Sequence, residues 1–263
     1  MLKNKVILVT GSNGGIGFGI AKLCQSKGAT VVLHGRNPEA IKAAAAKIGP
    51  DTSYVIADLG AADAPEVIIN EVVAKHGRID GLVNNAAALD RCTLETATNE
   101  LIDRMFTLNF RAPLMLMQAA VAQMKKQATV GSTAGSIVNI GSVNAICGAE
   151  TLLVYSATKA ALGTATVNLG AALARDHIRV NQLNVGWTVT ENEHKIQRSE
   201  GQPADWQDHI PANFTPSGGL LTPEHIAQHA AFWLSEASAP VTGQTLEIEQ
   251  FPYLGKAFWS SFE

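Results

Sequence analysis

Near the start of the chain, a short apolar strand pattern runs directly into a glycine-rich turn and then into a helical pattern, and few folds accommodate that order. Residues 6–10 read Val-Ile-Leu-Val-Thr, and glycines follow at positions 11, 14, 15 and 17. Apolar residues then recur with helical spacing from Ile20 to Cys24. Such a turn lets an anion approach the start of the helix, where free N–H groups and the helix dipole favour negative charge. The pattern therefore predicts a phosphate-binding βα unit.

The alternation of strand and helix patterns continues along the chain. Further strands are predicted at 30–34, 54–57, 79–84, 135–140, 178–183 and 244–248, and helices at 38–48, 63–76, 99–126, 152–176 and 224–235. Pro113 is expected to bend or break the longest helix. Alternating strands and helices form right-handed crossovers, which give a parallel sheet covered on both faces. We therefore predict an α/β, doubly wound fold with one seven-stranded parallel sheet, in a single domain over residues 1–263.

Composition narrows the classes of protein to which the chain can belong. With 263 residues, 46% of them hydrophobic, it can bury one large core. A net charge of −3 without a basic stripe argues against a nucleic-acid partner. Cys24, Cys92 and Cys147 are too few and too scattered for a disulfide framework or a metal site, and they fit a reducing compartment. No apolar run is long enough for a signal peptide or a membrane span, so we expect a cytoplasmic protein.

A tyrosine and a lysine four residues apart form a candidate proton-transfer pair. Tyr155 and Lys159 fall in the predicted helix 152–176, where residues i and i+4 share a face. A nearby ammonium favours the phenolate, so we expect the pKa of Tyr155 to fall from about 10 toward neutral. Such a tyrosine can exchange a proton with an alcohol or carbonyl oxygen. Taken alone, the spacing also suits a buried aromatic residue beside a surface lysine.

Four motifs stand at characteristic distances along the chain. They are the glycine loop Thr10-Gly11-x-x-x-Gly15-x-Gly17, the pair Asp58-Leu59, the segment Asn84-Asn85-Ala86, and the set Asn109, Ser142, Tyr155 and Lys159. In order and spacing they resemble the classical short-chain dehydrogenase/reductase (SDR) family, over about residues 5–249. The resemblance implies a Rossmann fold and an NAD(P)-dependent oxidoreductase that interconverts an alcohol and a carbonyl by hydride transfer.

The resemblance also implies roles for individual residues. Tyr155 would protonate the carbonyl oxygen in reduction, or accept the alcohol proton in oxidation, and Ser142 would hold the substrate oxygen. Lys159 would lower the pKa of Tyr155 and bind the nicotinamide ribose, while Asn109 would anchor a water that links Lys159 to solvent. The implied cofactor-binding residues are Gly11, Ser12, Asn13, Gly15, Ile16, Gly17, Arg36, Asp58, Leu59, Asn85, Tyr155, Lys159, Gly186 and Thr188.

Three positions depart from the family pattern, and none of them removes a catalytic group. Ala87 stands where a glycine usually follows Asn-Asn-Ala, and Val185 replaces the usual proline before Gly186. The last strand leads into Glu249-Gln250 instead of Asp-Gly-Gly, which alters the region of the family's usual subunit contacts.

The end of the second strand predicts the cofactor. NAD-preferring relatives place an aspartate there, which binds both hydroxyls of the adenosine ribose and repels a 2′-phosphate. Here the position is Gly35, and Arg36 follows with a side chain that can pair with a phosphate. NADP is therefore the predicted cofactor. NAD is the alternative, because Ser12 stands where many NADP-binding relatives carry a second basic residue.

The segment at about 190–222 corresponds to the family's substrate lid. It is polar and includes an aromatic residue, Trp206, that could serve as a platform, so a sugar, polyol or other polar small molecule is the expected substrate. His194 and His209 lack the spacing of a metal site. Two alternatives stay open: a 3-oxoacyl thioester reductase, and a non-catalytic dinucleotide-binding sensor or scaffold.

Two helices and the end of the chain predict self-association. The predicted helices 99–126 and 152–176 carry apolar residues on more than one face. In the family these helices pack against symmetry mates to give dimers and tetramers. The aromatic C-terminal tail at 251–263 is expected to pack on a neighbouring subunit or back on its own chain. We therefore expect a homotetramer or homodimer.

Overall fold

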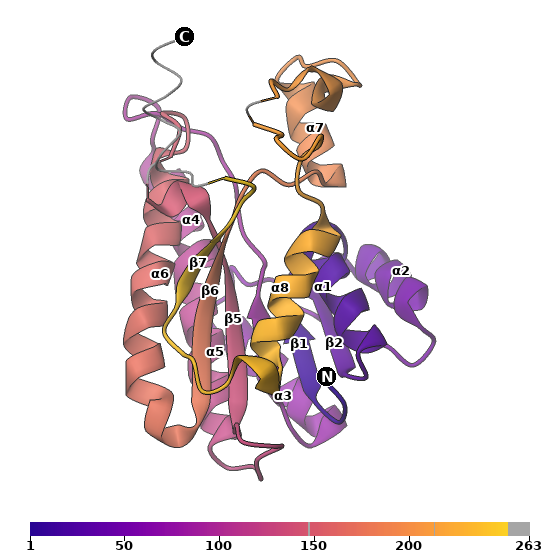
Figure 1. Cartoon of the computed structure of the whole chain (residues 1–263). Helices are drawn as coiled ribbons and strands as arrows, with labels where there is room; N and C mark the ends of the chain where they lie inside the picture. Colours follow the sequence, from indigo (N-terminus) through magenta and orange to yellow (C-terminus); the bar gives the residue numbers. More distant parts are fainter. Residues whose placement is uncertain (147, 213, 252–263) are drawn as a thin grey trace.

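A computed structural model describes residues 1–146, 148–212 and 214–251 and contains one seven-stranded sheet, in the order β3-β2-β1-β4-β5-β6-β7 (Figure 1). All neighbouring strands are parallel. The strand order reverses between β1 and β4, and in such sheets ligands bind at the carboxyl ends of the strands beside that point. The predicted doubly wound Rossmann fold is confirmed. The strands are β1 (Val6–Val9), β2 (Thr30–Gly35), β3 (Ser53–Ile56), β4 (Gly81–Asn84), β5 (Gly135–Ser142), β6 (Ile178–Val185) and β7 (Thr245–Ile248).

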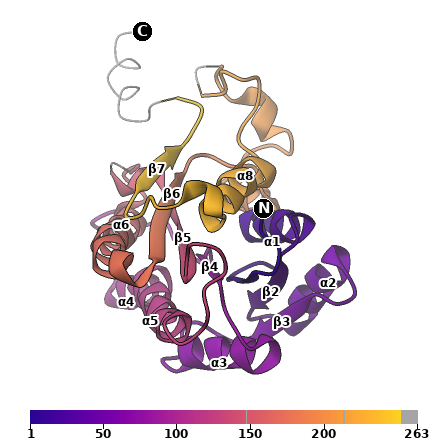
Figure 2. The ribbon, with the colours of Figure 1, turned by 60° about the horizontal axis from the view of Figure 1, so that its bottom comes forward.

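Helices cover both faces of the sheet (Figure 2). One face packs against α1 (Gly15–Ser26), α2 (Pro38–Ile48) and α8 (Pro223–Leu234). The other packs against α3 (Ala64–His76), α5 (Ala112–Met124) and α6 (Leu153–Leu173), and α4 (Asn99–Phe106) packs against α6 in a third, smaller cluster. The two resulting hydrophobic clusters share the strands between them, which explains why the strands read as continuous apolar runs instead of alternating patterns.

The long helix predicted at 99–126 consists of three consecutive pieces. A π-helical turn at Thr107–Arg111 separates α4 from α5, and Pro113 lies in the first turn of α5. Pro113 has no N–H to donate to the carbonyl of residue 109, four positions earlier, so the regular ladder of helical hydrogen bonds is interrupted there. The predicted break is confirmed, and it places Asn109 inside the irregular turn.

One helix was not predicted. α7 (Glu191–Ser199) stands over the carboxyl ends of the strands, and its only buried residue is Gln197 (Figure 1). An apolar stripe is the main signal for a surface helix, and this helix has none. Cys147 and most of the tail predicted at 251–263 lie outside the described residues. Within the described ranges, no helix is long and apolar enough to cross a membrane.

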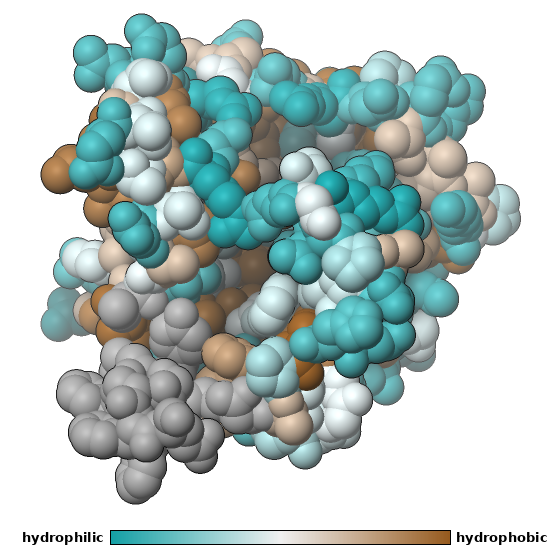
Figure 3. All heavy atoms as spheres, turned by 90° about the horizontal axis from the view of Figure 1, so that it is seen from above, coloured by the Kyte–Doolittle hydropathy of each residue, from teal (hydrophilic) through white to brown (hydrophobic). Residues whose placement is uncertain are grey.

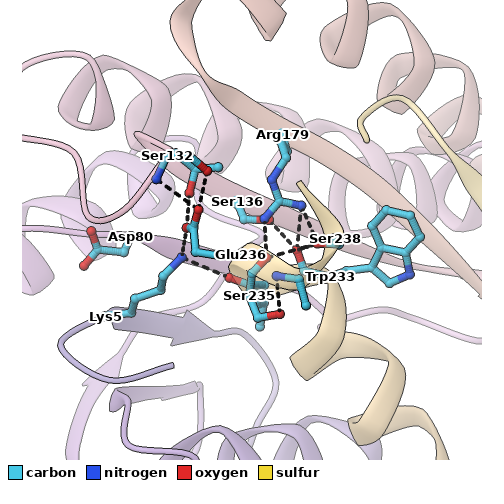
Figure 4. Close-up of polar contacts among 12 residues, drawn as sticks. Lys5, Asp80, Ser132, Ser136, Arg179, Trp233, Ser235, Glu236 and Ser238 are labelled. Atoms are coloured by element: carbon cyan, nitrogen blue, oxygen red, sulfur yellow. Dashed lines mark hydrogen bonds and ion pairs between the residues drawn. The ribbon is translucent and has the colours of Figure 1, made fainter. Parts of the chain in front are cut away.

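A network of polar side chains connects strands at the edge of the sheet formed by their amino-terminal ends, which is opposite the edge that α7 covers (Figure 4). The Glu236 carboxylate accepts hydrogen bonds from Lys5 Nζ at 2.8 Å, from Thr133 Oγ1 at 2.7 Å and from the Ser132 N–H at 3.0 Å. Burial raises the pKa of Glu236, but these hydrogen bonds outweigh it and lower the pKa to about 2. Nearby, the buried Arg179 guanidinium donates to backbone carbonyls at the end of α8. The network fixes the start of β1 against the turn after α8.

Candidate active site

The glycine loop turns the chain from β1 into α1 at the carboxyl edge of the sheet. Gly11 has a φ of +61°, and a Cβ at Gly17 would lie 2.6 Å from the Gly11 carbonyl oxygen, so both positions require glycine. No side chain caps α1 at Gly14, and its first turn holds no acidic residue, so its amide groups stay available for an anion. Asn13, Gly14 and Gly15 also border a pocket of about 530 Å³, but this pocket runs along α1, α2 and α8 and its lining includes none of Ser142, Tyr155 and Lys159. The loop fits the pyrophosphate of a dinucleotide.

The buried side chains of Ser12 and His34 hold the backbone of this loop in place through hydrogen bonds. Ser12 Oγ donates to the Val9 carbonyl at 2.8 Å and accepts from the His34 N–H at 3.0 Å, so its side chain shapes the loop from within. His34 Nδ1 accepts from the Gly11 N–H at 3.4 Å, which leaves the proton on Nε2, 3.2 Å from the Ala57 carbonyl oxygen. Burial lowers the pKa of His34 to about 4, so the ring is neutral at pH 7. His34 was not among the predicted site residues, although a polar residue inside an apolar strand is a signal that could have identified it.

The residues predicted to contact the adenosine half of the cofactor lie at the ends of β2 and β3. Arg36 is exposed directly after β2 and makes no hydrogen bond or ion pair with any described residue. Asp58 is exposed after β3, and its Oδ1 accepts from the Gly60 N–H at 2.9 Å. Leu59 is buried in the core beneath them. Arg36 is therefore a cation available to a ligand at this edge.

The other predicted cofactor residues border the glycine loop or follow β6. Asn85 Nδ2 donates to the carbonyls of Thr10 at 2.9 Å and Gly11 at 3.0 Å, which ties the end of β4 to the loop. The Gly186 N–H donates to the Ile248 carbonyl at 2.9 Å. Thr188 is buried, with its Oγ1 3.1 Å from the Gly186 carbonyl. Ile16 packs against the apolar cluster that α1 covers.

The structure brings three of the four predicted catalytic residues together beside this edge. Ser142 ends β5, and Tyr155 and Lys159 lie one turn apart on α6. The Ser142 hydroxyl lies close enough to Tyr155 to favour the charged form of the tyrosine. Lys159 Nζ lies 5.7 Å from the centroid of the Tyr155 ring and donates to the Ile140 carbonyl at 2.8 Å. A proton donor, a neutral hydrogen-bonding hydroxyl and an ammonium group therefore converge on one point.

The expected lowering of the tyrosine pKa is wrong for the protein alone. Burial raises the pKa of Tyr155 to about 12, and the nearby Ser142 hydroxyl only partly offsets this effect. Burial also lowers the pKa of Lys159 to about 8. The spacing of the two residues indicates the effect of the lysine charge alone. Desolvation, which disfavours the charged form of both groups, depends on the folded surroundings.

Asn109 is buried in the π-helical turn, and its side chain is occupied by protein contacts. Its Oδ1 accepts from the Ala88 N–H at 2.7 Å, and its Nδ2 donates to the Ala88 carbonyl at 2.9 Å and to Thr158 Oγ1 at 3.1 Å. Thr158 precedes Lys159 on α6. The amide of Asn109 therefore joins the loop after β4 to α6, the helix that carries Tyr155.

Two tryptophans lie at the segment that follows β6, and their roles differ from the expectation. Trp206 is 4% exposed, so it cannot offer a platform to a substrate. Trp187 is 37% exposed and stacks on Trp206, with ring centroids 5.6 Å apart and planes inclined by 21°. Trp187 was not among the predicted site residues, because no sequence pattern shows which aromatic side chains stay exposed. Figure 3 looks down on this end of the molecule, where hydrophilic side chains surround hollows with hydrophobic side chains at their base.

The departures from the family pattern have local explanations. A Cβ on Gly186 would lie 1.9 Å from Glu249 Oε2, so this carboxylate fits only because residue 186 is glycine. Glu249 accepts from the Trp187 N–H at 3.0 Å and so holds the backbone that leaves β6. Val185 is buried in the core, and Ala87 is exposed. Among the residues that the structure describes, no cluster of His, Cys, Asp and Glu is arranged to hold a metal ion.

Comparisons with known proteins agree with this geometry. The family model described as enoyl-(acyl carrier protein) reductase matches residues 11–250. A galactitol 2-dehydrogenase of Agrobacterium fabrum is 31% identical over 94% of this chain and 97% of its own length. A 3-oxoacyl-[acyl-carrier-protein] reductase of Chlamydia muridarum is also 31% identical, over 95% of this chain and 97% of its own.

Solved structures give the same picture. A 3-oxoacyl (acyl-carrier-protein) reductase from Agrobacterium tumefaciens with NADP bound has a TM-score of 0.84 and 28% identity, over 94% of this chain and 93% of that chain. A 3-ketoacyl-(acyl-carrier-protein) reductase from Brucella melitensis complexed with NADH has a TM-score of 0.82 and 28% identity, over 95% of this chain and 98% of that chain. Both kinds of nicotinamide dinucleotide thus occur among similar folds.

Proposed function

The chain belongs to the short-chain dehydrogenase/reductase family of NAD(P)-dependent oxidoreductases that act on CH–OH groups, and within it we propose an NADP-dependent enzyme for a sugar, polyol or similar polar molecule. The observation that carries the proposal is the convergence of Ser142, Tyr155 and Lys159 beside the glycine loop. When bound, the nicotinamide supplies or accepts the hydride. The protein contributes orientation and proton transfer.

Tyr155 is the proposed proton donor in the direction of carbonyl reduction. With a pKa of about 12, its hydroxyl is protonated at neutral pH. Ser142 lies beside that hydroxyl, so a carbonyl oxygen placed between the two receives a hydrogen bond from each. Charge that develops on this oxygen is then stabilised by donors that already point at it.

Lys159 is the proposed source of positive charge next to Tyr155. Its Nζ is buried and bound to the Ile140 carbonyl, and its three protons leave donors for further groups. As a phenolate forms on Tyr155, the ammonium group stabilises it electrostatically. No carboxylate of the described residues pairs with it, and an unpaired buried cation is costly, which supports a functional reason for its position.

NADP is the proposed cofactor, with NAD as the alternative. Arg36 is exposed next to the position where an aspartate would otherwise repel a 2′-phosphate, and it has no protein partner among the described residues. A guanidinium can bind a phosphate through two parallel hydrogen bonds. A neighbouring fold binds NADP and another binds NADH, so the family itself allows either.

The proposed substrate class depends on the segment at 190–222, which we propose to be the lid. Its helix α7 reads Glu-Asn-Glu-His-Lys-Ile-Gln-Arg-Ser, a surface that suits hydroxyl groups better than an acyl chain. The similarity to a galactitol 2-dehydrogenase supports this choice. The similarity to a 3-oxoacyl-[acyl-carrier-protein] reductase favours the second candidate, a 3-oxoacyl thioester reductase.

A substrate screen with both cofactors tests the proposal. Sugars, sugar acids, polyols and their keto forms are compared with acyl thioesters, and consumption or formation of the reduced cofactor is followed at 340 nm, about the absorption maximum of its nicotinamide. We expect the best kcat/KM for a polyhydroxylated compound with NADP(H). A higher value for acyl thioesters would make the second candidate the function. Dinucleotide binding without turnover of any compound would instead indicate a sensor or scaffold.

We further propose a homodimer or homotetramer of single-domain subunits in the cytoplasm. The outer faces of α4 and α6 expose Phe106, Leu153 and Val167, which supports contact with a second copy through these helices. The free thiols of Cys24 and Cys92 fit a reducing compartment. Light scattering at micromolar concentration tests the assembly, and a stable monomer would refute it.

A further inference from the structure

Helix α7 spans the distance between the glycine loop and the catalytic tyrosine. It begins after Thr190, whose Cγ2 would lie 3.5 Å from a Cβ on Gly15. It ends at Ser199, and Oε2 of the next residue, Glu200, accepts from Arg91 Nη2 at 3.3 Å. The same guanidinium reaches Thr151 Oγ1 at 3.4 Å, four positions before Tyr155. At 1.5 Å per residue, a nine-residue helix is about 14 Å long, enough to cross a substrate site.

Trp187 follows the end of β6 and lies next to α7. Val185, at the end of β6, pairs in register with Ser142 at the end of β5, and Trp187 follows two residues later. Neighbouring strands lie about 4.8 Å apart. The backbone of Trp187, two residues beyond Val185, therefore lies close to the proposed catalytic residue Ser142. The position of Trp187 is therefore set by the same strand pair that positions Ser142.

The orientation of the Trp187 indole is fixed by two contacts, and the residues that make them are themselves held in place. One face stacks on the buried ring of Trp206, and the indole Nε1 donates to Glu193 Oε1 at 2.9 Å. Gln197 Nε2 donates to the same oxygen at 2.9 Å. Trp206 is itself held by a bond of 3.0 Å from its Nε1 to His194 Nδ1. A large aromatic ring held this firmly, yet 37% exposed, offers a pre-organised contact surface.

Glu193 adds a hydrogen-bond acceptor beside this ring. Its Oε1 receives both hydrogen bonds, whereas Oε2 accepts none from the described part of the chain. A sugar or polyol presents an apolar face of C–H groups and a rim of hydroxyl donors. The C–H face suits an exposed indole, and a hydroxyl suits a free carboxylate oxygen, through a charge-assisted hydrogen bond.

We propose that Trp187 and Glu193 form the subsite that selects a polyhydroxylated substrate. The carbon chain of the substrate stacks on the exposed indole face of Trp187, and one hydroxyl donates to Glu193 Oε2. Trp206, His194 and Gln197 are positioning residues, because they act through these two. The inference rests on the proposed function and assigns its substrate specificity to two side chains.

Binding without turnover provides the test. In a Tyr155→Phe background saturated with NADP, the affinity for galactitol and for the best polyol of the screen is measured by calorimetry. Trp187→Leu is expected to weaken polyol binding at least about tenfold, equivalent to about 1.4 kcal/mol, and to leave NADP binding unchanged. Trp187→Phe keeps an aromatic face and is expected to retain most of the affinity. Phe232→Leu, at an aromatic ring of similar exposure on α8, is the matched control and is expected to change neither affinity.

A second variant separates the two groups of the subsite. Glu193→Gln keeps the size of the side chain and removes its charge, so polyols are expected to bind more weakly while the unchanged NADP affinity reports an intact fold. Polyol affinity that stays the same in Trp187→Leu, or falls together with NADP affinity, would overturn the subsite alone. Wild-type turnover of acyl thioesters but of no polyol would overturn the proposed substrate class, and the subsite with it.

Discussion

Asn109 and Ala88 exchange two hydrogen bonds. The side-chain amide of Asn109 pairs with both the N–H and the carbonyl of Ala88, as the backbone of a neighbouring strand would. The Ala88 N–H donates to Asn109 Oδ1 at 2.7 Å, and the Ala88 carbonyl accepts from Nδ2 at 2.9 Å. Ala88 lies in the loop after β4, next to the segment whose Asn85 holds the glycine loop. The pair therefore couples the cofactor side of the site to the helix that carries Tyr155.

Asn109→Ala is expected to destabilise the protein, because it leaves the buried N–H and carbonyl of Ala88 without partners. An unsatisfied buried group costs about 1–3 kcal/mol, so the expected loss in the free energy of unfolding is about 2–4 kcal/mol. Urea denaturation measures it. Asn109→Asp retains the acceptor and loses the donor, so it is expected to lie between wild type and Ala. A loss below about 0.5 kcal/mol, the size of an ordinary surface substitution, would contradict the role.

Tyr155→Phe is expected to reduce turnover by about 10²- to 10⁴-fold or more, because only the proton donor is removed. Cofactor affinity, measured by fluorescence of the reduced nicotinamide, is expected to stay near the wild-type value. Tyr54→Phe, on the exposed β3, is the matched control and should leave turnover unchanged. Substantial turnover in Tyr155→Phe would refute the assignment.

The rate of carbonyl reduction is expected to fall as pH rises above about 8, where the buried Lys159 loses its proton. Burial lowers this pKa, so the charged form needed beside Tyr155 is present below about 8 and is lost above it. Tyr155, with a pKa of about 12, stays protonated over the same range and cannot cause the decline. The pH profile of kcat/KM between about 6 and 10 measures it.

Lys159→Arg provides the comparison for this profile, since a guanidinium stays charged throughout that range. Any residual activity of this variant should show no decline near pH 8. A wild-type rate that is independent of pH up to about 10 would mean that Lys159 keeps its proton, or that its charge is not required.

Arg36→Ala is expected to weaken NADP(H) binding and to spare NAD(H), because the guanidinium would contact only the 2′-phosphate. A charge-assisted hydrogen bond contributes about 1.5–3 kcal/mol, so the affinity for NADPH should fall by about 10- to 150-fold. Fluorescence titration with both reduced cofactors measures the difference. Lys75→Ala, at an exposed cation on α3, controls for net charge. Equal losses for the two cofactors, or a wild-type preference for NAD, would overturn the choice of NADP.

Glu236→Gln is expected to lower stability at pH 7 and to have a clearly smaller effect near pH 3. The pKa of Glu236 is about 2 in the folded protein against 4.5 for the free group, so its contribution is complete above pH 4.5 and is lost as pH falls toward 2. The side chain is 36% exposed, and after discounting for solvent screening we expect about 1–2 kcal/mol. Urea denaturation at both pH values measures the contribution, with Glu71→Gln on the exposed side of α3 as control. An equal effect at both pH values would contradict the charge-dependent role of Glu236.

The order of strands and helices could be predicted from the sequence because each element carries its own signal. The apolar runs of the strands, the glycines at 11 and 17 and the break before Pro113 act over a few neighbouring residues. The spacing of four residues likewise predicted that Tyr155 and Lys159 share one face of a helix, whereas the place of Ser142 beside them was implied by the family resemblance. Local periodicity and local backbone sterics determined this much of the protein.

Only the tertiary structure decided the pKa values in the site and which aromatic side chain of the segment after β6 stays exposed. The pKa of Tyr155 depends on how much surrounding protein removes water, and no pair spacing reveals that. Trp206 was the tryptophan expected to offer a platform, but packing buried it and left Trp187 exposed. The bond between Arg91 and Glu200 joins residues more than a hundred positions apart. Burial and long-range contact are properties of the folded surface, so they follow from the sequence only through the complete fold.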